Sequence, residues 1–226
     1  MTALVRMRLA GFVRGGRILA PLIAVLVELG IIYGGGASPA AVAYGYSAAA
    51  LFPVLAWLTK LLLDTEPDTQ RRLARLAVGP AHEGAAGIAG ALILSLLVCA
   101  AAMAAPWLFH GIDTTKALAG GVALGALAHL LAVPPAVAVG ALASRAVTGS
   151  VRLGVTVLVV SAVLVVVLGL SGSYAPWLVP PVMATARALN REGLPSAATM
   201  LGLTAWAVAW SLVAYAGYGR LRRARA

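Results

Sequence analysis

Two ionisable side chains lie in the middle of apolar runs, where they could bind or relay protons. Glu28 is ten residues into the run 18–34, and His129 is twelve residues into the run 117–142. At 1.5 Å per helical residue these positions are about 15 Å and about 18 Å deep, near the centre of a bilayer. Ionisable groups at that depth are costly and usually serve a function. We expect both to face the protein interior, either paired or lining a cavity, or else to be satisfied separately in structural roles.

A second group of charged residues forms a polar island between two apolar runs. Segment 64–85 has the sequence DTEPDTQRRLARLAVGPAHEGA. Charged side chains between two membrane-length runs must lie in water, so the island is a place where another protein can dock. Its charged members are Asp64, Glu66, Asp68, Arg71, Arg72, Arg75 and Glu83.

The island carries the signals of a bounded helix. Residues 65–68 (TEPD) fit a capping box, so we expect a helix over 68–78 that ends at the Gly-Pro pair 79–80. Its apolar side chains share one face, which a partner would cover; the alternative is a solvated loop helix without a partner. The residues of the expected contact surface are Glu66, Asp68, Arg71, Arg72, Leu73, Arg75 and Leu76.

The composition places the chain in the membrane class. Of its 226 residues 62% are hydrophobic and 11% are charged, and the mean hydropathy is +0.96, whereas soluble domains carry about 25% charged residues. The net charge of +10 would suggest nucleic acid for a soluble chain, but the orientation of membrane segments explains it better, so we expect no nucleic-acid partner. Cys99 is the only cysteine, which excludes an intrachain disulfide framework and a cysteine metal cluster.

The apolar runs that must position these residues predict an all-α membrane protein with six transmembrane helices. Each run is near the roughly 20 residues that cross a bilayer, and none shows the alternation of barrel strands. Residues 1–17 predict a short amphipathic helix in the membrane interface, and 35–39 and 110–116 predict short turns. The expected spans are 18–34, 40–63, 86–109, 117–142, 153–171 and 197–218.

Lysine and arginine orient the expected spans. Fourteen of the seventeen fall on the side that carries both termini, and the other three are Lys116, Arg187 and Arg191. The positive-inside rule therefore predicts that both termini are cytoplasmic. The loop 172–196 is then extracytoplasmic. We expect it to contain a short interfacial or re-entrant helix with Arg187 and Arg191 facing water.

The sequence lacks two common catalytic motifs, and a third occurs with its residues in the wrong order. The sequence contains no G-x-x-x-x-G-K-[ST] and no H-E-x-x-H, so any ATP hydrolysis must come from another chain. Residues 169–172 (GLSG) resemble the nucleophile motif of rhomboid proteases, but His129 precedes Ser171, the reverse of the order in that family. We therefore expect that the chain is not an enzyme. The pair Gly121 and Gly125 permits close helix packing.

The whole architecture resembles the ABC-2 type permeases, the membrane subunits of ATP-binding cassette exporters. Residues 6–30 (RMRLAGFVRGGRILAPLIAVLVELG) resemble the connecting helix and first span of small bacterial members. Residues 65–80 (TEPDTQRRLARLAVGP) resemble the segment that enters the ATPase groove. The likeness covers nearly the whole chain and rests on architecture rather than on an invariant motif.

The resemblance implies a function and a set of partners. It implies a permease of the bacterial cytoplasmic (inner) membrane, paired with a second permease as a homodimer or paralogous heterodimer. Two ABC ATPase subunits would bind ATP and Mg and push the 65–80 segment, while this chain itself binds no cofactor. The exported substrate would be hydrophobic or amphipathic: a drug, a peptide or a lipid. In such exporters the first and fifth spans meet at the dimer centre, which would place Glu28 near the translocation path.

Two other functions fit the same residues. A proton-coupled secondary transporter would use Glu28 and His129 as its relay, although such folds usually carry inverted repeats and broken helices. A non-transporting membrane subunit would use the island only to anchor or scaffold a partner.

Overall fold

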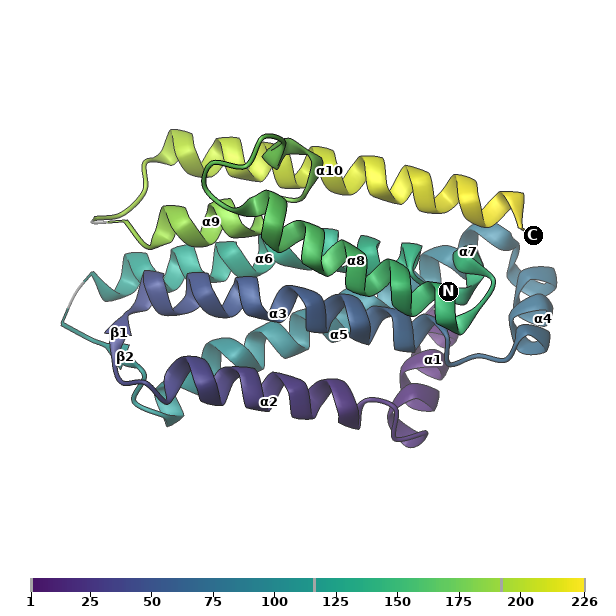
Figure 1. Ribbon diagram of the computed structural model, residues 1–226. Coiled ribbons are helices and arrows are strands. Elements are labelled where there is room, and N and C mark those ends of the chain that lie inside the picture. The colour runs from purple at the N-terminus through teal and green to yellow at the C-terminus, as the bar shows by residue number, and fades with distance from the viewer. Residues whose placement is uncertain (1, 116, 192, 226) are drawn as a thin grey trace.

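The computed structural model describes residues 2–115, 117–191 and 193–225, so Lys116 of the charge count lies outside the described residues. Long helices run side by side along one axis, and both ends of the chain lie at the same end of the bundle (Figure 1). The elements are α1 (Thr2–Arg14), α2 (Leu19–Tyr33), β1 (Ser38–Pro39), α3 (Ala40–Leu63), α4 (Asp68–Val78), α5 (Pro80–Leu108), β2 (Ile112–Asp113), α6 (Leu118–Leu142), α7 (Arg145–Thr148), α8 (Val151–Gly169), the 3-10 turn η1 (Pro176–Leu178), α9 (Val182–Leu189) and α10 (Ala197–Ala224).

The helices have the lengths and compositions of a multi-pass membrane protein. Within the described residues five helices, α3, α5, α6, α8 and α10, are long and apolar enough to cross a bilayer. A sixth span results if α1 and α2, which meet at a bend of 75°, are counted together. The expectation of an all-α membrane architecture is confirmed at this level.

The core of the bundle is the pair α3 and α6, which pack closely because glycines face the partner helix. A side chain at Gly121 would come within 2.9 Å of Ala40 Cβ, and one at Gly125 would overlap Tyr44. The close packing expected for these two glycines is confirmed. Tyr44 also donates a hydrogen bond of 2.8 Å to the Met103 carbonyl, which ties α3 to α5.

Helix boundaries near the island differ from the sequence expectation in two places. Gly79 has a φ of +82°, so the chain turns there and α5 begins directly at Pro80 rather than at residue 86. The expected capping box is wrong: the Thr65 hydroxyl donates back to the Leu61 carbonyl at 2.8 Å, and no side chain caps α4. At the other end of the chain, α10 continues past residue 218 to Ala224.

At the end of the bundle away from the termini, the two expected turns meet. Residues Ser38 and Pro39 of β1 pair in parallel with Ile112 and Asp113 of β2. This two-residue bridge holds the α2–α3 connection against the α5–α6 connection.

Helix α9 is inserted between the long helices rather than lying over them (Figure 1). Pro181 and Val182, at its start, line a small cavity with Ala132 of α6, and Ala132 is about 21 Å along α6 from Leu118. The start of α9 is therefore near the middle of the bundle. Arg187 was expected to face water, but it is half-buried and donates a hydrogen bond to the Gly169 carbonyl at the end of α8.

Candidate functional site

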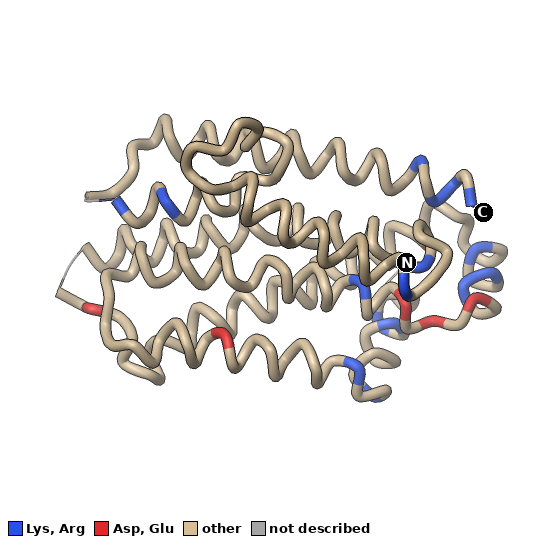
Figure 2. The backbone as a smooth tube through the Cα atoms, in the orientation of Figure 1, with Lys and Arg blue, Asp and Glu red and all other residues tan. Residues whose placement is uncertain are grey.

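Most of the described Lys and Arg side chains gather at one end of the bundle, which we call the basic end. It carries both termini, α4 and α7 (Figure 2). Helix α4 crosses this end outside the bundle of long helices (Figure 1). Helix α4 contains the arginines and leucines of the expected contact surface. Its contacts with neighbouring helices therefore determine which of these side chains remain available to a partner.

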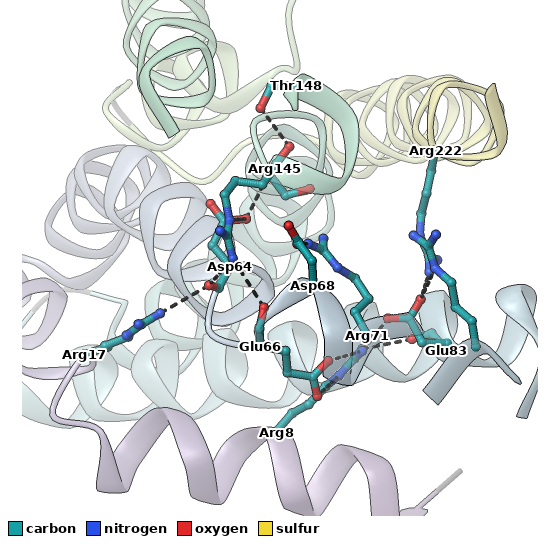
Figure 3. Close-up of polar contacts among 12 residues, drawn as sticks. Arg8, Arg17, Asp64, Glu66, Asp68, Arg71, Glu83, Arg145, Thr148 and Arg222 are labelled. Atoms are coloured by element: carbon teal, nitrogen blue, oxygen red, sulfur yellow. Dashed lines mark hydrogen bonds and ion pairs between the residues drawn. The ribbon is translucent and has the colours of Figure 1, made fainter. Parts of the chain in front are cut away.

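A buried arginine of α1 joins the segment before α4 to α5. Arg8 Nε and Nη2 lie 2.9 Å and 2.7 Å from the two carboxylate oxygens of Glu66, which is a bidentate pair. Arg8 Nη1 also donates to the Glu83 carbonyl at 2.9 Å, and its Nη2 forms an ion pair with the Glu83 carboxylate (Figure 3). All three side chains are buried, so water competes little for these contacts.

Glu83 gathers further guanidinium groups around its carboxylate. Arg75 Nε of α4 lies 3.3 Å from Glu83 Oε2, and Arg222 of α10 forms an ion pair with the same oxygen. Gly84 leaves space beside it for the Arg222 guanidinium, which a side chain at that position would overlap. One carboxylate therefore links α1, α4, α5 and α10.

Asp64, at the end of α3, forms a second junction. Its carboxylate accepts a hydrogen bond from Lys60 Nζ at 2.7 Å and one from the Arg145 backbone N–H at 2.8 Å. Arg145 Nη2 donates to the Asp64 and Glu66 carbonyls at 3.2 Å and 3.3 Å, and Arg17 donates to the Asp64 carbonyl at 3.2 Å. The connection between α3 and α4 is thereby fixed to α7 and to the α1–α2 bend.

The residues of the expected contact surface divide into two groups. Three are buried or half-buried: Glu66 and Arg75, which pair with other helices, and Arg71, which pairs with Asp68 of α4 itself. Those that remain exposed are Asp68, Arg72, Leu73 and Leu76. The exposed fractions of Leu73 and Leu76 are 63% and 84%. These values are high for leucine side chains on a helix that an ion pair attaches to the bundle.

An apolar groove of about 610 Å³ lies between α1 and α4. Leu73, Ala74 and Ala77 of α4 form one side, and Leu4 and Met7 of α1 form the other. Leu76 lies beside the groove and is more exposed still. The groove and Leu76 together present an apolar surface at the end of the molecule that is otherwise the most charged.

Sequence reasoning did not find the partners that hold α4. The helical pattern of residues 1–17 places Arg8 near the edge of the apolar arc and Arg6 and Arg14 away from it, and in the structure Arg8 is buried and the other two are exposed. The ion-pair partners of Arg8 were not predicted. Arg222 was counted only as a positive charge. The one available signal was that Arg8 shares a helix face with Val5 and Phe12, which are also buried.

The structure does not join Glu28 to His129. His129 Nδ1 lies 2.8 Å from the Gly125 carbonyl, and its Nε2 lies 3.3 Å from Ser47 Oγ, so both ring nitrogens have other partners. Glu28 is half-buried in α2, and its Oε2 is buried with no hydrogen-bond partner among the described residues. The functional roles expected for these two residues remain predictions.

A metal-dependent activity would need a cluster of ligating side chains. Among the described residues no group of three His, Cys, Asp or Glu side chains could hold a metal ion. Comparisons with protein-family models, with curated proteins and with solved structures find no match to this chain.

Proposed function

We propose that this chain is the permease subunit of an ABC-2 type exporter in the bacterial cytoplasmic membrane, with its basic end in the cytoplasm. The observation that carries the proposal is the arrangement of α4. An ion pair between Arg75 and Glu83 ties this helix to α5, and the buried pair Arg8–Glu66 ties the connection before it to α1. Leu73 and Leu76 stay exposed. A helix that is firmly held on one side and apolar on the other is suited to receive a partner and pass on its movement.

In this proposal a separate ATPase subunit, which binds ATP and Mg, docks on Leu76 and in the groove between α1 and α4. Closure of the ATPase pushes α4. Because α4 is joined to α5 by the single residue Gly79 and to Glu83 by Arg75, the push moves α5. The shared carboxylate of Glu83 passes it to α1 and α10. A second permease, identical or paralogous, completes the path for a hydrophobic or amphipathic substrate.

Co-purification tests the docking surface. We expect the tagged chain, isolated from its own host, to bring down an ATP-hydrolysing subunit identified by mass spectrometry through its P-loop. The double variant Leu73→Asp/Leu76→Asp should lose that subunit. The control Leu194→Asp changes a half-exposed leucine at the opposite end, where 51% of the side chain is exposed, and should retain it. Retention of the ATPase and of ATP-driven export by the double variant, or no ATPase with the wild type, would refute the proposal.

A second function, proton-coupled transport, is favoured by one observation. Glu28 holds a buried carboxylate oxygen without a hydrogen-bond partner among the described residues, at the tenth of the fifteen residues of α2, and an ionisable group within a membrane span usually serves a function. Export that stops on addition of a protonophore at constant ATP, and that Glu28→Gln also abolishes, would establish this function instead.

A further inference from the structure

The opposite face of α4 lines a separate pocket that is almost purely cationic. The pocket has a volume of about 280 Å³ and lies between α4, α7 and the end of α10. It is distinct from the apolar groove between α1 and α4, because the two are lined by different residues of α4. Its charged lining consists of Arg71, Arg72, Arg75, Arg145, Arg225 and Asp68.

The positive charge of this pocket is not neutralised by the acids around it. Asp68 is the only acid among the lining residues, and it is bonded to Arg71. Two lining arginines also pair with acids outside the pocket, Arg75 with Glu83 at 3.3 Å and Arg145 with Asp64 at 3.9 Å. Those acids are shared with other cations, because Glu83 also pairs with Arg8 and Arg222, and Asp64 also pairs with Lys60. The hydrogen bond and charge of Arg71, together with the charges of Arg145 and Arg72, hold the pKa of Asp68 below its usual value, as expected where cations outnumber acids.

Two of the guanidinium groups have donors to spare. Arg71 is only 8% exposed, and its Nη1 is buried with no hydrogen-bond partner among the described residues. Arg145 Nε is also buried without a hydrogen bond, and its ion pair with Asp64 Oδ1 is long, at 3.9 Å. Arg225 lies against Gly149, whose φ of +78° and lack of a side chain leave room for that guanidinium. Converging guanidinium groups with free donors are the usual protein environment of a phosphate group.

We propose that this pocket binds a phosphate group, carried by an anionic lipid headgroup or by a soluble phosphate compound. Arg71, Arg75 and Arg145 each pair with an acid, but Arg72 and Arg225 also line the pocket, and a phosphate offers more oxygens and more charge than a carboxylate. Basic pockets between helices at the membrane surface bind lipid headgroups in the same way.

The neighbouring groove points to the lipid as the source. A groove of about 650 Å³ runs between α5 and α10, with Ile88, Ala89 and Leu92 along its apolar wall. Arg75 lines both this groove and the cationic pocket. A lipid with its headgroup at the arginines therefore has an apolar path for an acyl chain directly beside it.

Two matched double variants of the purified full-length protein test the pocket. Arg72→Gln/Arg225→Gln removes two exposed arginines that line it, and Arg152→Gln/Arg220→Gln removes two exposed arginines at the same end that do not. Phosphatidylglycerol binding is measured by native mass spectrometry against phosphatidylcholine, and inorganic phosphate binding by calorimetry. We expect the pocket variant to bind phosphatidylglycerol at least about tenfold more weakly, as for the loss of one charge-assisted hydrogen bond, and the control variant to change less than about twofold.

The variant Ala89→Trp, which fills the groove, separates the two sources of phosphate. Weaker phosphatidylglycerol binding with unchanged inorganic phosphate binding identifies a lipid. Inorganic phosphate binding that the pocket variant abolishes, without selective binding of phosphatidylglycerol, identifies a soluble compound. Equal losses in the two double variants, or no binding of either probe by the wild type, would overturn the proposal, because the arginines would then act only as diffuse charge.

Discussion

Arg8 and Glu66 form a buried bidentate ion pair between residues that are 58 positions apart in the sequence. The pair attaches α1 to the connection that leads into α4, so the N-terminal helix helps to position α4. In the same place Arg8 reaches Glu83 of α5. The position of α4 is thus set by two helices that precede and follow it in the chain.

Removal of Arg8 should destabilise the protein strongly. Arg8→Ala leaves Glu66 without its ion-pair partner in a buried site, which costs about 3–5 kcal/mol. The free energy of unfolding, measured by SDS titration of the detergent-solubilised protein, should fall by that amount. Arg8→Met/Glu66→Leu should recover part of the loss, because the carboxylate that lost its partner is also gone. Arg6→Ala, on the exposed side of α1, should change the value by less than about 0.5 kcal/mol; an equal loss in both single variants would contradict the prediction.

A methyl group at Gly125 should separate α3 from α6. Tyr44, which a side chain at Gly125 would overlap, is completely buried and cannot move aside. Gly125→Ala should therefore lower the free energy of unfolding by about 1–3 kcal/mol. Gly202→Ala makes the same change where no atom lies within 4 Å, and it should be neutral or stabilise by about 0.5–1 kcal/mol. Identical SDS-unfolding midpoints for the two variants would show that α6 can shift away from α3.

The sequence allowed the long helices and α4 to be predicted because their limits are set locally. The apolar run 40–63 coincides with α3, and the helix expected over 68–78 coincides with α4, ended by Gly79 and Pro80. Run length, glycine and proline act within a few residues of the boundary they determine. The early start of α5 was missed because His82 and Glu83 interrupt the apolar run, although Pro80 is a good first residue for a helix.

The ion pairs at the basic end could not be predicted from the sequence in the same way. Choosing Glu66 and Glu83 as partners of Arg8 requires knowing how α1 folds back at its 75° bend with α2. Arg71 and Arg75 resemble Arg72 in sequence, and only the packing of α4 decides which of them is buried. The helical period predicts the face that carries Leu73 and Leu76, with arginines at its edges, since Arg72 lies one turn before Leu76.

The depth of α9 can be measured by cysteine labelling. Val182 is buried at the start of α9, whereas Asn190 lies exposed beyond its end. In a Cys99→Ala background we expect Asn190→Cys to react in intact cells with a membrane-impermeant maleimide and Val182→Cys to remain unlabelled. A helix lying flat in the interface would let water reach both ends, so labelling of Val182→Cys at a similar rate would contradict the inserted position. Labelling after denaturation shows that both cysteines are present.

We expect Glu28 to lower the stability of the protein and to be retained because it has a function. One of its carboxylate oxygens is buried without a hydrogen-bond partner among the described residues, and a buried polar group left unsatisfied costs about 1–3 kcal/mol. Glu28→Leu should therefore raise the free energy of unfolding in SDS titration by an amount in that range. Glu28→Gln keeps a polar group of the same shape at the same place and should change the value little. If Glu28→Leu is instead destabilising, the carboxyl group holds α2 in place and its role is structural. If Glu28→Leu is stabilising and export is lost in both variants, the carboxylate is retained for transport.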